Sequence, residues 1–143
     1  MKYCGEEYIM RESNYILHES VMESIYIEDS SLLICFSKEL YYKKNNQILL
    51  SNKRIMKIAI TNLRRDHEYE HINIKITKKN GKIGEISLLD FSDLIQRFKV
   101  KVYLDLYANY FNVLLIKGNI GKMEAEFETT ISEVEHISFL SKK

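Results

Sequence analysis

The sequence of 143 residues lacks proline and tryptophan altogether and contains two cysteines and five glycines. Two cysteines are too few for a disulfide framework, and Cys35 lies inside an apolar run, where a buried free thiol is usual. A Cys4–Cys35 disulfide is the less favoured alternative. The absence of proline, together with abundant lysine, isoleucine, asparagine and tyrosine, indicates AT-rich coding bias rather than a function.

Long apolar segments are also missing. No run approaches the roughly 20 apolar residues that a membrane-spanning helix needs. The first 13 residues include two adjacent glutamates and no apolar core of the kind found in secretory signals. We therefore expect no membrane partner and a cytoplasmic location.

A charge excess of one sign is absent, since 21 lysines and arginines stand against 20 aspartates and glutamates. This balance argues against a dedicated nucleic-acid-binding protein. Charge is nevertheless segregated, because residues 38–82 contain 12 basic and 4 acidic residues, whereas residues 1–37 contain 2 and 7. Either the folded domain has a dipolar surface that steers a charged partner, or neighbouring strands interleave the blocks and cancel them.

Signatures of catalysis are missing as well. The sequence has no Ser-His-Asp order, glycine-rich phosphate loop, CxxC pair or paired-carboxylate pattern, so we expect no enzyme activity, no cofactor and no metal site. His18, Glu19 and Glu23 form the most tempting group, but a zinc-binding helix needs a second histidine at position 22, which is methionine. His67 and His71 flank a polar break, where a solvated loop is favoured over a metal site.

Alternation of apolar and polar residues with a period of two dominates the chain and predicts half-buried strands. Along residues 99–107 it places Val100, Val102, Leu104 and Leu106 on one face. Residues 32–36 and 110–118 are apolar on both faces, so the first strand is predicted to be covered on both sides and the second to be central. Residues 41–47 are predicted to be a loop, and residues 135–141 a last strand, with a short helix as the alternative.

The segment around Asn80-Gly81 predicts a hairpin with a defined register. A two-residue turn would put the apolar sets of the two strands on opposite faces. A three-residue loop of Lys79, Asn80 and Gly81 instead sets Ile74 opposite Ile86, and Ile72 opposite Leu88, and it gives glycine the left-handed position of a bulge. We therefore predict the three-residue loop.

A single segment has convincing helical periodicity, namely residues 90–98. Phe91, Leu94, Ile95 and Phe98 share one face, and Asp90 is the predicted N-terminal cap. The short connections elsewhere favour antiparallel neighbours. The prediction is a single domain over residues 1–143 that is mainly β, with α+β at the margin. It consists of an antiparallel curved sheet or two-sheet sandwich of about eight strands, with one short helix near residues 90–98.

Candidate binding residues occur in three places. His18 and Glu19 precede the first predicted strand, where a surface contact competes with a purely structural role. Tyr41 and Tyr42 adjoin two lysines, which can serve a protein contact or, less favourably, nucleic acid. The third place is a row of like charges on one predicted strand, formed by Glu124, Glu126 and Glu128. Such a row needs either a neighbouring strand with lysines, such as the strand of Lys75 or Lys101, or a basic partner.

The opening Leu17-His18-Glu19-Ser20, followed directly by the strand and hairpin of residues 21–36, resembles the start of YxiG-like, immunity-type proteins of bacterial polymorphic-toxin loci. These proteins commonly begin with a Leu-His-Asp-Ser motif, and Glu19 stands here in place of the aspartate. The resemblance covers about 20 residues. It implies a non-enzymatic cytoplasmic protein that binds and neutralises a cognate toxin.

The sequence thus favours a bacterial protein that acts by protein–protein binding, with a toxin as one candidate partner and a homodimer as a further candidate. The alternative is a small-molecule-binding β domain whose curved sheet encloses an apolar pocket. A third hypothesis is an enzyme that uses His18 with an acid from a distant strand.

Overall fold

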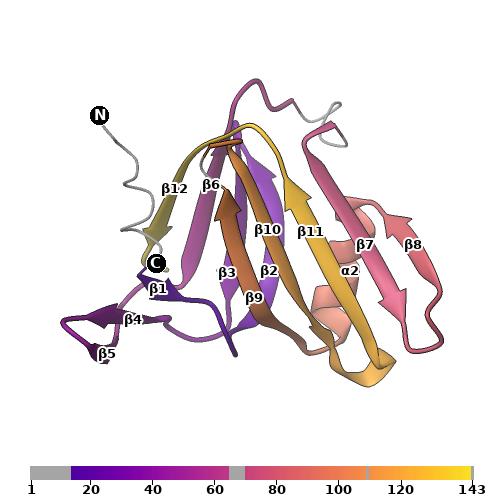
Figure 1. Cartoon of the computed structure of the whole chain (residues 1–143), viewed down its shortest axis with the longest axis horizontal. Helices are drawn as coiled ribbons and strands as arrows, with labels where there is room; N and C mark the ends of the chain where they lie inside the picture. Colours follow the sequence, from indigo (N-terminus) through magenta and orange to yellow (C-terminus); the bar gives the residue numbers. More distant parts are fainter. Residues whose placement is uncertain (1–13, 65–69, 109, 143) are drawn as a thin grey trace.

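A computed structural model describes residues 14–64, 70–108 and 110–142. Their helical elements are the α-helix α2 (Leu88–Arg97) and the short 3-10 helix η2 (Gly121–Met123). The strands of these residues, shown in Figure 1, are β1 (Tyr15–Ile16), β2 (Val21–Glu28), β3 (Ser31–Phe36), β4 (Tyr41–Lys44), β5 (Gln47–Leu50), β6 (Ile55–Ile60), β7 (Ile72–Lys78), β8 (Ile83–Ile86), β9 (Val100–Ala108), β10 (Val113–Ile120), β11 (Ala125–Ile131) and β12 (Val134–Leu140).

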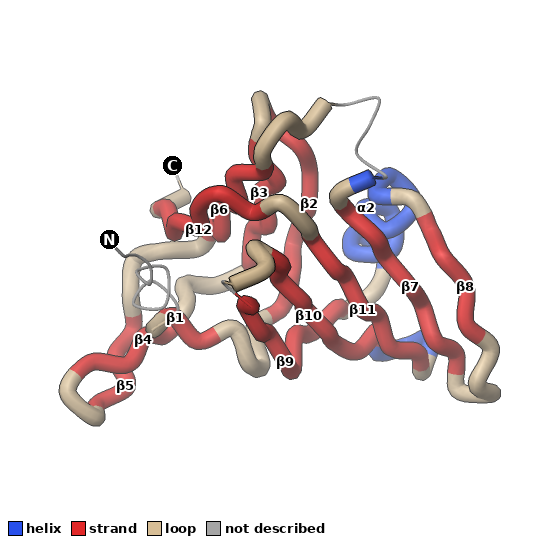
Figure 2. Tube along the Cα trace, turned by 45° about the horizontal axis from the view of Figure 1, so that its top comes forward, coloured by secondary structure: helices blue, strands red, loops and turns tan. Residues whose placement is uncertain are grey.

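Within these described ranges the strands form two open antiparallel sheets. The larger has nine strands in the order β12-β6-β3-β2-β9-β10-β11-β7-β8, and the smaller has the order β1-β4-β5. β2 and β9 pair only through Val21 with Lys101 and Met22 with Val100, so the large sheet folds back on itself at this junction. Figures 1 and 2 show its two halves facing each other, with the β4–β5 hairpin projecting to one side.

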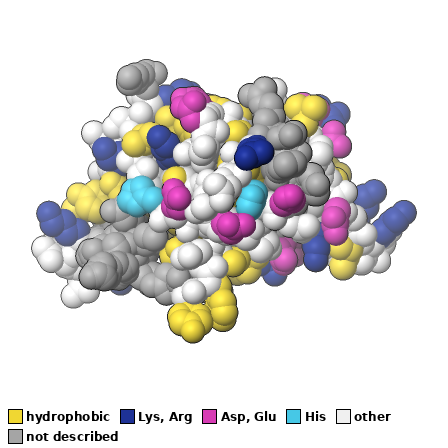
Figure 3. All heavy atoms as spheres, turned by 90° about the horizontal axis from the view of Figure 1, so that it is seen from above, with side chains coloured by type: hydrophobic (Ala, Val, Ile, Leu, Met, Phe, Trp, Pro, Cys, Tyr) yellow, Lys and Arg dark blue, Asp and Glu magenta, His cyan; other side chains and the backbone are white. Residues whose placement is uncertain are grey.

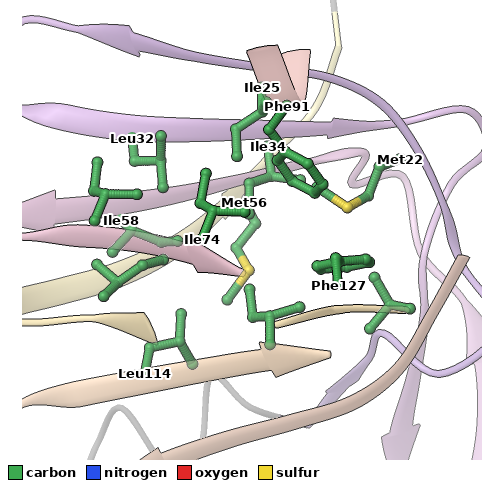
Figure 4. Packing of buried hydrophobic residues seen from close by; sticks show 14 of the residues in the cluster. Met22, Ile25, Leu32, Ile34, Met56, Ile58, Ile74, Phe91, Leu114 and Phe127 are labelled. Atoms are coloured by element: carbon green, nitrogen blue, oxygen red, sulfur yellow. The ribbon is translucent and has the colours of Figure 1, made fainter. Parts of the chain in front are cut away.

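The core lies between the two halves of the large sheet. Figure 4 shows Met22 and Ile34 from one half pointing toward Ile74 and Phe127 from the other. Each such fully buried side chain contributes roughly 1.5–3 kcal/mol relative to exposure. The predicted mainly β antiparallel fold with one short helix is therefore confirmed, and the folded-back sheet combines the curved sheet and the sandwich that the sequence left open.

The predicted coverage of individual strands is also confirmed. All six residues of β3 are buried, and β10 is central, since it pairs with β9 and β11. Cys35 is a buried free thiol, while Cys4 lies outside the described residues. Residues 134–140 form a strand rather than a helix, paired with β6.

The hairpin between β7 and β8 has the predicted register. Ile74 lies opposite Ile86, and the N–H of Lys78 donates to the carbonyl of Lys82 across the three-residue loop. Gly81 has a φ of +88°, a conformation that favours a residue without Cβ. The further pairing of Ile72 with Leu88 does not form, because Leu88 is already the first residue of α2.

The helix α2 begins two residues before the predicted cap. Ser87 is the N-terminal cap, since its hydroxyl accepts from the N–H of Asp90 at 3.1 Å. Asp90 lies instead in the first turn, where a negative charge interacts favourably with the helix dipole. Phe91 and Ile95 are buried, and their face covers the opening between the two halves of the large sheet, beside β2 and β7.

The predicted loop over residues 41–47 is wrong, because β4 and β5 form a tight hairpin there. Asn45 and Asn46 make its two-residue turn, with φ of 51° and 64°. Positive φ at both positions is typical of the type I′ turn that joins antiparallel strands, and asparagine tolerates it better than most residues. β1 completes the small sheet by pairing Tyr15 with Tyr42.

β9 carries a bulge in its middle. Lys117 of β10 pairs with Leu104, but the next residue, Gly118, pairs with Val102, so Tyr103 is one residue too many on β9. Gly118 is needed here, because a Cβ at this position would lie 2.2 Å from the Lys101 carbonyl oxygen and 2.3 Å from a ring carbon of Phe127.

The bulge reverses which face each later residue of β9 presents. Asp105 lies beside buried Ile116 and so shares the core-side face. Leu104 and Leu106, in contrast, are 41% and 59% exposed. The sequence prediction that both leucines share a face with Val102 is therefore wrong, because period-two alternation does not survive an inserted residue.

We expect Gly118→Ala to lower the free energy of unfolding by about 2–4 kcal/mol, because the neighbouring Lys101 backbone and Phe127 ring must shift. Gly84→Ala in β8 is the matched control, since a Cβ there meets nothing within 4 Å. Urea unfolding of both variants measures the difference. Equal stability of the two would show that the bulge is not tightly packed.

Candidate functional site

Leu17-His18-Glu19-Ser20 forms a tight turn at the junction of the two halves of the large sheet. Leu17 is buried, and its carbonyl accepts hydrogen bonds from the N–H and the hydroxyl of Ser20. Glu19 has a φ of 72°. Its N–H donates to the Val102 carbonyl at 2.8 Å, and the N–H of Val102 donates to the Ser20 carbonyl at 2.9 Å. The motif therefore ties β2 to β9.

A groove with a volume of about 930 Å³ lies beside this turn, between the small sheet and the end of α2. We call it the β5 groove. Of the seven candidate residues, it brings together His18, Glu19 and Tyr41. Glu23, the third member of the group that the sequence singled out, also lines it. Its apolar lining includes Ile16, Met22, Leu40, Leu50, Ile95 and Phe98.

Two acidic residues of the β5 groove, Glu19 and Glu23, are held by cations of the same chain. Lys101 Nζ lies 3.1 Å from Glu19 Oε1, and this hydrogen bond lowers the pKa of the Glu19 carboxyl. Lys142 Nζ lies 2.7 Å from Glu23 Oε2 and lowers the pKa of that carboxyl in the same way, with Arg54 at 3.7 Å. Of these three cations only Arg54 belongs to the basic block of residues 38–82, whereas Lys101 and Lys142 lie later in the chain.

His18 is well exposed and makes local contacts. Its Nδ1 lies 3.1 Å from the Tyr103 carbonyl oxygen, and its Nε2 lies 3.5 Å from the Glu19 carboxylate. Glu19 is already paired with Lys101, so this carboxylate is oriented by a lysine. These contacts hold the imidazole against the turn.

The two tyrosines of β4 point to opposite faces of the small sheet. Tyr41 lines the β5 groove, whereas Tyr42 lies beside Tyr15, with ring centroids 5.8 Å apart. Tyr15 in turn stacks on Phe139 at 4.3 Å. Tyr42 therefore faces the side of the small sheet that packs toward β12.

The strongest apolar feature beside the groove is β5, which the sequence analysis missed. All four of its residues are exposed, with Ile48 at 65% and Leu50 at 60%. β4 pairs with one side of β5, and no strand of the described ranges pairs with the other. The Asn45-Asn46 turn is the sequence signal that could have revealed this hairpin.

The three glutamates near β11 do not line this groove and are compensated by neighbours. Glu124 precedes β11, and its carboxylate lies 2.8 Å from Lys79 Nζ. Glu126 accepts a hydrogen bond of 2.8 Å from the Tyr103 hydroxyl, which raises the pKa of that tyrosine.

Glu128, the third glutamate of the row, lies between lysines of the two neighbouring strands. It lies 3.8 Å from Lys117 of β10 and opposite Lys75 of β7. The lysine-bearing neighbour that the sequence required is thus β7, while the strand of Lys101 is not adjacent to β11. The acidic row is largely a cross-strand charge pattern.

His71 corrects the expectation of a solvated loop. It is buried at the start of β7, and its Nδ1 lies 3.4 Å from a Glu133 carboxylate oxygen without a hydrogen bond. Figure 3 shows histidine and acidic side chains close together at this end of the molecule. His67 lies outside the described residues, whose His, Cys, Asp and Glu side chains include no group of three that could hold a metal ion.

A second, much smaller hollow lies on the core side of β9, with a volume of about 20 Å³. We call it the Asp105 hollow. Among the described residues that line it, Asp105 alone has a charged side chain, and burial raises the pKa of this carboxyl. No hydrogen bond or ion pair to Asp105 occurs among the described residues. The remaining walls are Tyr15, Met56, Tyr107, Leu114, Ile137 and Phe139.

Comparison with protein-family models, with curated proteins and with solved structures finds no match for this chain. None of the helices described here is long and apolar enough to span a bilayer.

We expect Asp105→Asn to raise the free energy of unfolding at pH 7 by about 1 kcal/mol, since an unpaired charged group loses its burial penalty. The raised pKa means that the folded state binds the proton more tightly than the unfolded state. The stability that proton binding to Asp105 contributes is therefore fully present below the ordinary pKa of 3.8. It is lost as pH rises through the pKa of the folded state. The gain of the variant should shrink toward pH 3.

Thermal and urea unfolding at both pH values measure this effect. Asp93→Asn on the exposed side of α2 is the control and should change stability little. A loss of stability for Asp105→Asn at pH 7 would show that the carboxylate has a stabilising partner.

Proposed function

We propose that this chain is a protein-binding module that adds an extended segment of another protein to the free edge of β5. The observation that carries the proposal is that β5 combines exposed apolar side chains with an edge to which no strand of residues 14–64, 70–108 or 110–142 pairs. Exposed apolar edge strands invite pairing with another chain, and natural proteins usually cover or charge them. An edge left apolar therefore favours a binding role.

The backbone of β5 is oriented for strand addition. The N–H of Ser51 donates to the Leu40 carbonyl, so Ser51 faces the β4 side of the hairpin. Because successive residues of a strand direct their amides to alternate sides, Leu49 also faces β4, while the amides of Ile48 and Leu50 face outward. An incoming strand would find both donors and acceptors at these two residues.

Side chains beside this edge supply apolar contacts. Ile48, Leu50 and Tyr41 share one face of the hairpin, because Tyr41 lies opposite Leu50 in the register. Two of them, Tyr41 and Leu50, line the β5 groove. A partner strand on β5 would place alternate side chains over this groove, where an aromatic anchor such as Tyr41 contributes strongly to binding.

The partner class follows from the resemblance of the Leu17–Ser20 opening to immunity-type proteins. On that basis the partner is a cognate toxin encoded beside this protein, and its neutralisation takes place in the cytoplasm without catalysis by this chain. The exposed β5 edge supports protein binding in general, while the choice of a toxin rests on the resemblance.

The proposal is tested with Ile48→Lys, measured as the dissociation constant for the product of an adjacent gene. We expect at least a tenfold loss of affinity, because a lysine replaces an apolar contact at the edge. Ile83→Lys is the matched control, since Ile83 lies on an edge strand of the large sheet, β8, and has the same 65% exposure as Ile48. Equal affinity of both variants and the wild type would overturn the proposal.

We expect His18→Ala to leave the affinity for that partner within about threefold of wild type, because the exposed imidazole bonds to the chain's own Tyr103 backbone. The same binding assay measures it, with circular dichroism to check the fold. A hundredfold loss would instead make His18 a direct contact.

A small-molecule-binding function is the second candidate, because the β5 groove is large and apolar side chains form part of its lining. With this function, a bound ligand would shield groove side chains such as Phe98 and Ile95 from solvent, and not the backbone of β5. Competition between a groove ligand and the protein partner would distinguish overlapping from separate sites.

A further inference from the structure

The Asp105 hollow lies outside the β5 groove, between the two halves of the large sheet. Its walls come from β1, β6, β9, β10 and β12, so residues distant in sequence converge there. Tyr15 and Phe139 stack at 4.3 Å on one side, and Met56 and Leu114 are buried at its base. The result is an aromatic and aliphatic hollow around a single carboxylate.

The fold delivers this carboxylate by a specific device. Without the bulge at Tyr103, period-two alternation would continue and leucine would occupy the inner face of β9 in place of Asp105. Bulges commonly re-aim side chains next to functional sites. A lone carboxylate in an apolar setting is also unfavourable for folding, and such departures from ordinary core composition concentrate at binding sites.

The chemistry of the hollow selects one kind of ligand. A carboxylate forms its strongest hydrogen bonds with cationic N–H donors, and aromatic faces attract cations. A volume of about 20 Å³ is close to the space that one water molecule needs. An ammonium group has that size, whereas a planar guanidinium is larger.

We propose that the Asp105 hollow binds a primary ammonium group carried on an apolar stem, with Asp105 as its anion and Tyr15, Tyr107 and Phe139 around it. The chemistry is the same for a free alkylamine and for a lysine side chain of another protein. This site is separate from β5 and does not depend on the function proposed for that edge.

The test uses the full-length protein and n-butylammonium at neutral pH, with tyrosine and methionine NMR signals as the readout. We expect saturable shifts near Tyr15, Tyr107 and Met56 in the millimolar range. Neutral n-butanol should bind at least tenfold more weakly, because it has the stem without the charge. An absence of saturable shifts, or equal binding of amine and alcohol, would overturn the proposal.

Asp105→Asn is the deciding variant and should weaken amine binding at least tenfold while melting at the same or a higher temperature than wild type. Asp93→Asn should bind like wild type. Retained amine binding by Asp105→Asn would overturn the proposal. The melting temperature of this variant excludes unfolding as the reason for a loss of amine binding. Ile48→Lys should bind the amine normally, which separates this test from that of the β5 edge.

Two further probes distinguish the sources of the ammonium group. N-acetyl-lysine methylamide represents a protein side chain, and its norleucine analogue lacks the charge. Tighter binding of the lysine derivative than of n-butylammonium would assign the hollow to a partner's lysine, and the reverse order would assign it to a free amine. Both orders support the ammonium site, provided that the norleucine analogue fails to compete.

Discussion

The junction between β2 and β9 is the constraint on which the rest of the structure depends. Two residue pairs and the reciprocal hydrogen bonds of Glu19 and Ser20 with Val102 hold it together. Because the large sheet turns there, its two halves face each other, and each half buries an apolar face against the other. Leu17, packed under the turn, anchors this corner in the core. The opening Leu-His-Glu-Ser motif is thus explained first as a structural corner.

The two candidate binding sites both arise beside this corner. β1 leaves from the N-terminal side of the turn, and the small sheet projects to one side of the large one (Figure 1). The β5 groove opens between this small sheet and the end of α2. On the other side, the bulge at Tyr103 follows the junction along β9 and turns Asp105 toward the core side. In the described part of the chain, the groove beside the β5 edge and the hollow around Asp105 thus lie on either side of one corner of the large sheet.

Sequence reasoning succeeded where apolar alternation and turn chemistry act locally. It predicted the antiparallel β architecture, the β7–β8 register and the burial of both faces of β3. It failed at Leu104 and Leu106, because the bulge depends on how closely Gly118 of β10 packs against the neighbouring strands β9 and β11. It also failed at Ser87, because it assigned the cap to Asp90, one helical turn too late. It placed His18, Glu19 and Tyr41 among the candidates, yet the β5 edge and Asp105 required tertiary information about which strand remains unpaired and which face is inward.

Residue-resolved hydrogen exchange of β5 tests the central claim most directly. In the free protein, the amides of Ile48 and Leu50 should exchange within seconds, while that of Leu49 is protected by β4. In the complex with its protein partner, Ile48 and Leu50 should become protected together, with little change at Ile83 of β8. Protection of both amides already in the free protein, or no change on binding, would contradict strand addition at this edge.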